Sequence, residues 1–114
     1  MVHLGMSKSA QLSVSRGLAE TCAGTGVTVN SVLPGPMRTE GVGEFFATLA
    51  REAGQTLVQA ERDFFKSGRP ISLLQRFIEP AEVVAMVAYV CSPRAAATNG
   101  AALRLDGGVV RSLI

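Results

Sequence analysis

The sequence predicts an α/β fold, the second half of a doubly wound parallel sheet whose first half is absent. Residues 27–33 form a short apolar run rich in β-branched side chains, with Gly26 before it and Pro34-Gly35-Pro36 after it, which is typical of a buried strand ending in a sharp loop. Helical periodicity flanks this run on both sides, and a second short apolar run follows at 101–105. The order helix, strand, helical excursion, helix, strand indicates an alternating α/β architecture.

Length and composition favour one globular unit. The chain has 114 residues, of which 47% are apolar and 18% are charged, and this composition matches a domain with a hydrophobic core rather than a disordered chain. We therefore expect a single partial domain over residues 1–114. The net charge is +2, the basic residues are scattered and only 5% of the residues are aromatic, so we expect no nucleic-acid partner.

Signals for a membrane, for export and for metal binding are weak. No apolar run approaches the roughly 20 residues of a membrane span, and the start MVHLGMSK lacks the long apolar region of a signal peptide, so we expect a cytoplasmic protein. Cys22 and Cys91 both lie in apolar helical patterns, which predicts small buried side chains in a reducing compartment. One histidine and no Cys/His/Asp spacing pattern predict no metal site.

Residues 5–23 have the periodicity of a helix. A helix that is apolar on more than one side is usually buried on more than one side, so we expect a sheet against one face and another helix against the other. The turn Ala23-Gly24-Thr25-Gly26 ends this helix. The main stripe recurs every four residues and consists of Ala10, Val14, Leu18 and Cys22.

The strand predicted at 27–33 has apolar residues on both faces, which fits a strand covered on both sides, as in parallel sheets. In an open α/β sheet, ligands bind in the crevice beyond the carboxyl ends of the strands. The loop from Pro34 to Thr39 follows this end. It is therefore the first place in the chain where we expect function.

Residues 40–68 are predicted to form a helical hairpin that Gly54 interrupts. Two interpretations of its aromatic content are open. The rings are either the core side of two amphipathic helices, which we favour, or an apolar lid over a pocket. Four of the five phenylalanines lie in this segment, namely Phe45, Phe46, Phe64 and Phe65.

A last helix is predicted at 80–91. Pro80 stands at its first position and Glu82 in its first turn, where an acidic residue complements the helix dipole. This helix is apolar nearly all round, and the Asn99-Gly100 turn signal separates it from the second strand. No glycine-rich turn of the G-x-G-x-x-G type follows a strand in this sequence, so there is no predicted seat for a pyrophosphate.

Short motifs along the chain have an informative order and spacing. They are Ser7-Lys8 with Ala10, Val29 to Gly35 with Thr39, Arg76-Phe77, Glu79 to Val83, Asn99-Gly100, and Leu105 to Gly108. In this order they resemble the C-terminal half of a short-chain dehydrogenase/reductase, along essentially the whole chain. The resemblance implies a Rossmann-like doubly wound parallel sheet and hydride transfer between a nicotinamide and an alcohol or carbonyl group.

The resemblance also implies a catalytic motif of a tyrosine followed four residues later by a lysine. Four residues place both groups on one helix face, where the lysine charge lowers the pKa of the phenol. Lys8 matches the lysine, and Leu4 stands at the tyrosine position. Leucine has no proton to give, Tyr89 does not match the motif, and His3 is a poor substitute. The family's catalytic serine has no counterpart in this chain, so we expect it to be inactive alone.

The cofactor implied by the resemblance is NAD or NADP. Its nicotinamide end would be held by Lys8, Pro34, Gly35, Met37 and Thr39. The adenosine and pyrophosphate half supplies most dinucleotide affinity, and this sequence has no predicted site for it, so we expect this chain alone to show no saturable cofactor binding below about 1 mM. In that state Lys8 is an ordinary solvated lysine and Pro34-Gly35-Pro36 an ordinary turn.

Two classes of function remain open. The chain is either a truncated or split version of an NAD(P)-dependent dehydrogenase, or a non-catalytic interaction and oligomerisation module derived from that family. In either case residues 40–68 would shape the substrate pocket of the parent enzyme. An apolar strand that lacks a neighbour is a template for pairing with another chain, so we expect a homo-oligomer. Its interface is expected at helix 5–23, helix 80–91 and strand 101–105.

Overall fold

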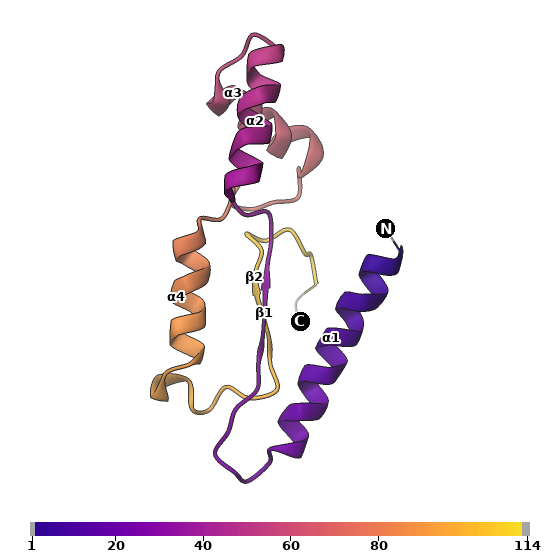
Figure 1. Cartoon of the computed structure of the whole chain (residues 1–114), viewed down its shortest axis with the longest axis vertical. Helices are drawn as coiled ribbons and strands as arrows, with labels where there is room; N and C mark the ends of the chain where they lie inside the picture. Colours follow the sequence, from indigo (N-terminus) through magenta and orange to yellow (C-terminus); the bar gives the residue numbers. More distant parts are fainter. Residues whose placement is uncertain (1, 113–114) are drawn as a thin grey trace. The chain divides into compact units, whose positions relative to one another are not determined.

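The computed structural model describes residues 2–112 and has the predicted α/β architecture. Its elements follow one another in the predicted order, and the helices and strands are labelled in Figure 1. They are α1 (Val2–Thr21), β1 (Ser31–Pro34), α2 (Glu40–Glu52), α3 (Leu57–Asp63), the π-helical η1 (Phe64–Gly68), α4 (Pro80–Val90), the 3₁₀-helical η2 (Pro93–Ala95) and β2 (Ala102–Leu105).

The two strands β1 and β2 pair side by side in a parallel sheet. The Ser31 N–H donates to the Ala101 carbonyl at 2.9 Å, and the Gly35 N–H donates to the Leu105 carbonyl at 3.0 Å. The partners advance in the same direction along both strands, which defines a parallel ladder. The prediction of a parallel α/β sheet with two strands is therefore confirmed.

The first strand is shorter than predicted. The prediction that it begins at Val27 was wrong, because asparagine side chains take part in the pairing before Ser31, beside a backbone bond from the Gly100 N–H to the Val29 carbonyl at 2.8 Å. The Val29 N–H donates to Oδ1 of Asn99 at 2.9 Å, and the Asn30 amide donates to the Thr98 carbonyl at 2.8 Å while its Oδ1 accepts from the Ala101 N–H at 3.1 Å. An asparagine side chain thus does the pairing that a neighbouring strand would otherwise do.

The chain divides into two compact units. The first comprises Met1–Leu33 with Ala85–Arg104, and the second comprises Pro34–Val84 with Leu105–Ile114. No helix within residues 2–112 combines the length and the apolar character needed to cross a membrane.

In the first unit, α1 forms close to the predicted bounds, but its apolar stripe is exposed. Val14 is 61% exposed and Leu18 is 51% exposed, whereas Ala19 is buried at 7%. The prediction that this helix is covered on two sides was therefore wrong for the described residues. The physical reason is that the rest of the unit packs against the small Ala19 side chain, which lies near Gly100. It does not cover the apolar stripe.

The two cysteines are free thiols just beyond the ends of helices. Cys22 follows α1 and is half-buried, and Cys91 follows α4 and is exposed. The prediction of two buried side chains was therefore wrong for Cys91. A residue after the last helical turn leaves the apolar pattern of that helix, so periodicity alone overestimates its burial.

In the second unit, the predicted hairpin forms from α2, α3 and η1 (residues 40–68), hereafter the helical hairpin. Gly54 links its helices with φ 64°, and Thr56 caps α3 through a capping box with Gln59. The rings pack edge to face at centroid distances of 5.0–5.2 Å, as for Phe65 on Phe77 and Phe46 on Phe77. The core interpretation of the phenylalanines is confirmed for Phe46 and Phe65, whereas Phe45 is 63% exposed.

The start of α4 forms as predicted, with Pro80 at its first position. The Glu82 carboxylate accepts from the Glu79 N–H at 2.8 Å and pairs with the Arg76 guanidinium through two bonds of 2.8 Å. This arrangement satisfies an otherwise unpaired N–H at the helix start. The helix was predicted to be apolar nearly all round, yet it has no fully buried residue.

Candidate functional site

The loop that follows β1 (residues 34–39, hereafter the post-β1 loop) lies against the turn that follows β2. A Cβ added at Gly35 would lie 2.7 Å from the Asp106 Cα and 2.8 Å from the Asp106 carbonyl oxygen. Any larger residue would have to move backbone, so the close approach of the two segments requires glycine here. The carboxyl ends of both parallel strands therefore meet at this point.

The turn after β2 is itself rigid. The Asp106 carboxylate accepts from the Gly108 N–H and from the Val110 N–H, both at 3.0 Å. The Gly107 carbonyl accepts from the amides of Leu73 and Leu74 at 2.9 and 3.1 Å. These bonds hold the backbone of the turn that Gly35 contacts in one geometry.

The middle of the post-β1 loop is clamped to the segment before α4. The Pro36 carbonyl accepts from the Ile78 N–H at 2.8 Å, and the Ile78 carbonyl accepts from the Arg38 N–H at 2.8 Å. Met37 and Ile78 thereby form an isolated parallel bridge. Ile78 is 2% exposed, so the clamp is anchored in the interior of the second unit.

Thr39 ends the loop and caps α2. Its backbone is extended at φ −92° and ψ 165°, and its Oγ1 accepts from the Val42 N–H at 3.3 Å. A hydroxyl that accepts one hydrogen bond still has a proton to donate. The side chain is exposed, so the structure leaves Thr39 able to donate to an external acceptor such as an amide oxygen.

Arg38 is a residue of this site that sequence reasoning missed. Its guanidinium forms a two-pronged ion pair with Glu61, with 3.0 Å between Nη2 and Oε2, and its Nε donates to Glu79 at 2.9 Å. The guanidinium carbon lies 5.6 Å from the centroid of the Phe77 ring. The hydrogen bonds to Glu61, and to a smaller extent the one to Glu79, raise the pKa of Arg38. No local pattern could have revealed these partners, because they are far away in the sequence.

The predicted catalytic residues lie on α1 in the first unit. Leu4 is 45% exposed, and the Lys8 ammonium, one turn further along, donates to Oε1 of Gln11 at 3.2 Å. Tyr89 lies on α4 and is 46% exposed. The structure thus brings Pro34, Gly35, Met37 and Thr39 together in one loop, and it places Lys8 in the other unit.

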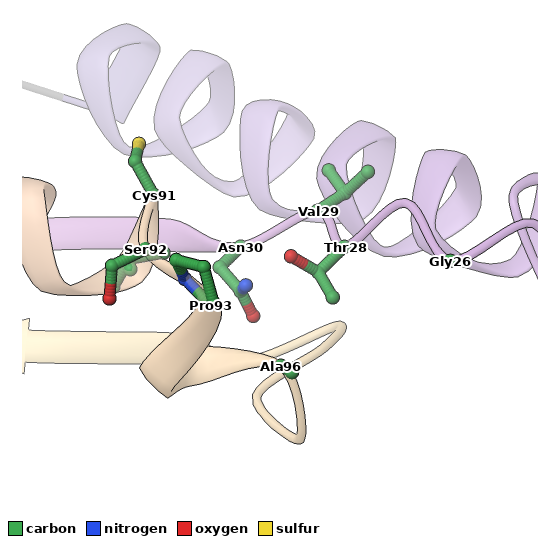
Figure 2. A pocket seen from close by; sticks show the side chains of 9 residues that line it. Gly26, Thr28, Val29, Asn30, Cys91, Ser92, Pro93 and Ala96 are labelled. Atoms are coloured by element: carbon green, nitrogen blue, oxygen red, sulfur yellow. The ribbon is translucent and has the colours of Figure 1, made fainter.

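A wide hollow of about 610 Å³ lies in the first unit, and Figure 2 shows its lining. It is bordered by the segment before β1 and by the segment after α4, at the start of the strands rather than beyond their carboxyl ends. Two of its polar groups are already bonded, since Asn30 bridges Thr98 and Ala101, and Ser92 donates to the Tyr89 carbonyl at 2.7 Å. We therefore assign the candidate site to the post-β1 loop.

Comparison with known families gives one extensive match. A family model described as enoyl-(acyl carrier protein) reductase matches residues 1–110. Among curated proteins, the uncharacterized oxidoreductases YvaG and YvrD of Bacillus subtilis are 48% and 46% identical, each over 113 residues and 99% of this chain. The galactitol 2-dehydrogenase (L-tagatose-forming) of Cereibacter sphaeroides is 34% identical over 103 residues, which are 90% of this chain and 35% of that protein. The chain spans 43% of the length of each Bacillus relative.

Solved structures agree on the fold. L-sorbose reductase from Gluconobacter frateurii, in complex with NADPH and L-sorbose, superposes with a TM-score of 0.80 at 24% identity, over 95% of this chain and 40% of that one. An actinorhodin polyketide ketoreductase variant with NADPH gives a TM-score of 0.72 at 28% identity, over 94% of this chain and 40% of that one.

Proposed function

The chain belongs to the short-chain dehydrogenase/reductase family, and from that premise we propose that it forms the nicotinamide-binding edge of an NAD(P)-dependent oxidoreductase. The reaction is hydride transfer between the nicotinamide and an alcohol or carbonyl carbon. The observation that supports this proposal best is the post-β1 loop. It follows the carboxyl end of β1, has a backbone fixed at Gly35 and Ile78, and ends in the free hydroxyl proton of Thr39.

Each loop residue has a role in this proposal. The Thr39 hydroxyl donates to the carboxamide oxygen of the nicotinamide, and the backbone around Met37 completes that edge. Pro34 and Gly35 flank the ring, and Gly35 keeps the loop close to Asp106. The Lys8 ammonium on α1 would hold the ribose hydroxyls. The actinorhodin polyketide ketoreductase variant has NADPH bound, which supports a nicotinamide dinucleotide as the ligand class.

We propose that these 114 residues do not turn over substrate by themselves. The proton donor of the reaction has no counterpart, because Leu4 occupies its position and is an alkyl side chain. The purified chain should give no oxidation or reduction of any aldehyde, ketone or alcohol with NAD(H) or NADP(H) above a heat-killed control. Leu4→Tyr should restore nothing alone, because the phosphate seat is still missing. Turnover by the unmodified chain would contradict this proposal.

The nicotinamide edge is tested by titrating ¹⁵N-labelled chain with NADPH and following amide chemical shifts. We expect a dissociation constant no tighter than about 1 mM, which corresponds to about 4 kcal/mol, with shift changes concentrated in residues 35–43. Thr39→Ser should retain the response. Thr39→Asp should abolish it, because aspartate still caps α2 but has no proton to donate. Saturation with no change in these amides would refute the assignment of the loop.

A second function is supported by α1. Leu4 replaces the catalytic residue, and the apolar side chains of Val14 and Leu18 are 61% and 51% exposed, which fits a non-catalytic oligomerisation module. In this alternative the chain self-associates through helix 5–23, helix 80–91 and strand 101–105. Light scattering at tens of micromolar should then give a mass of at least twice the 11.9 kDa of the chain. A uniform species of monomer mass would contradict it.

A further inference from the structure

The post-β1 loop is joined to the helical hairpin by one side chain. The Arg38 guanidinium reaches Glu61 on α3 through two hydrogen bonds and Glu79 through a third. The Glu61 side chain is 17% exposed and that of Arg38 is 35% exposed, so this ion pair is partly shielded from water. A planar guanidinium with three bonds to two carboxylates has little rotational freedom left.

The backbone of Arg38 lies at the centre of the proposed nicotinamide edge. Its N–H donates to the Ile78 carbonyl, the residue before it forms the parallel bridge to Ile78, and the residue after it is the cap Thr39. The side chain and the backbone of Arg38 therefore restrain the same short stretch from two directions. If the side-chain bonds were lost, the backbone hydrogen bonds to Ile78 would still restrain Arg38.

We propose that Arg38 is a positioning residue of this site, which fixes the Thr39 hydroxyl and the Met37 backbone by tying the post-β1 loop to the helical hairpin. The positioning role rests on the proposed function, whereas the restraint on the loop is measurable without any cofactor. Arg38 does not touch the ligand in this scheme. It acts through the geometry of its two neighbours in the chain.

The restraint is measured by amide hydrogen exchange of the full 114-residue chain. The amides of Arg38 and Ile78 report the clamp directly, because both are hydrogen-bonded across it. Arg38→Met should accelerate their exchange by about tenfold. Arg38→Lys keeps the charge and loses the two-pronged geometry, so it should give an intermediate acceleration of about threefold.

A matched control separates loop positioning from general loss of stability. Arg76→Met also removes a two-pronged ion pair in the second unit, the one with Glu82 at the start of α4, together with the 3.0 Å bond from Arg76 to the Phe77 carbonyl. We expect it to leave exchange at Arg38 unchanged relative to the other protected amides. The inference would be overturned if the amide at position 38 exchanged equally fast in Arg38→Met and in the unmodified chain. It would also be overturned if Arg76→Met accelerated this exchange as much as Arg38→Met does.

The NADPH titration supplies the functional readout. If the unmodified chain responds at residues 35–43, Arg38→Met should reduce the shift changes at least fivefold, Arg38→Lys should restore part of them, and Arg76→Met should leave them intact. A full response in Arg38→Met would refute the positioning role while the proposed function stands. If the unmodified chain does not respond, the proposed function fails, and the exchange experiment still decides whether Arg38 restrains the loop.

Discussion

The two units of the chain differ in what fills their interiors. In the second unit Phe46, Phe65 and Phe77 are at most 5% exposed and stack in one cluster with Ala50 and Ala60. In the first unit the buried side chains among residues 2–112 are the alanines Ala19 and Ala95. One unit therefore has an aromatic core of its own, and the other is held mainly by backbone bonds and by the two asparagines Asn30 and Asn99.

This difference shows that an apolar stripe in a sequence favours burial, but that other residues of the same chain do not always cover it. The stripe of the helical hairpin is covered by the rings of η1 and Phe77. The stripe of α1 has apolar residues at every fourth position, yet Val14 and Leu18 remain more than half exposed.

The aromatic core should dominate the stability of the second unit. Phe65 is 1% exposed, and truncation of a fully buried phenylalanine removes its contacts and leaves a cavity, so Phe65→Ala should lower the free energy of unfolding by about 3–5 kcal/mol. Leu18→Ala on the exposed face of α1 should change it by no more than about 0.5 kcal/mol. Urea titrations followed by circular dichroism measure both. A large cost for Leu18→Ala would mean that α1 is covered in solution, which would favour self-association.

The close approach between Gly35 and Asp106 should leave no room for a side chain at position 35. In Gly35→Ala the new Cβ would lie 2.7 Å from the Asp106 Cα, so we expect a loss of about 1–3 kcal/mol in the free energy of unfolding. Gly41→Ala is the control, because Gly41 lies in α2 with nothing within 4 Å of its added Cβ. That change should stabilise the chain by about 0.5–1 kcal/mol. Equal behaviour of the two variants in thermal unfolding would show that the backbones at 35 and 106 separate easily.

The first unit should depend on the Asn30 side chain. Asn30→Ala removes its bonds to the Thr98 carbonyl and to the Ala101 N–H, which should cost about 1–2 kcal/mol. Asn30→Asp keeps the acceptor for Ala101 and loses the donor, so it should cost less than Asn30→Ala. Amide exchange at Ala101 gives the measurement, and unchanged protection in Asn30→Ala would show that backbone bonds alone hold this turn.

The smallest effect concerns pH. Hydrogen bonds from Arg76 and from the Glu79 N–H lower the pKa of Glu82 from 4.5 to about 2. The folded state therefore keeps Glu82 charged where the unfolded state binds a proton, so this contribution is present above about pH 4.5 and is lost as the pH falls through about 2. Glu82→Gln should flatten that part of the pH dependence in thermal melts between pH 5 and 2. An identical acid dependence in Glu82→Gln would contradict this role.

Much of the fold could be predicted because its signals are local. Pro80 starts a helix at its first position, and Gly54 interrupts the hairpin. The loop of the candidate site could also be placed, since it follows a strand end. The contacts of Arg38 could not, because Glu61 and Glu79 are brought to it by folding. The single-domain assignment and the roles of Lys8, Pro34, Gly35, Met37 and Thr39 stay predictions.

The order of elements and the family could be inferred from the sequence alone, because both follow from residue types at fixed spacings. Only the tertiary structure decided the start of β1 at Ser31, the exposure of the α1 stripe and the close contact between Gly35 and Asp106. The reason is that periodicity and propensity report which surfaces favour burial. Whether another segment reaches those surfaces depends on contacts between residues that lie far apart in the chain.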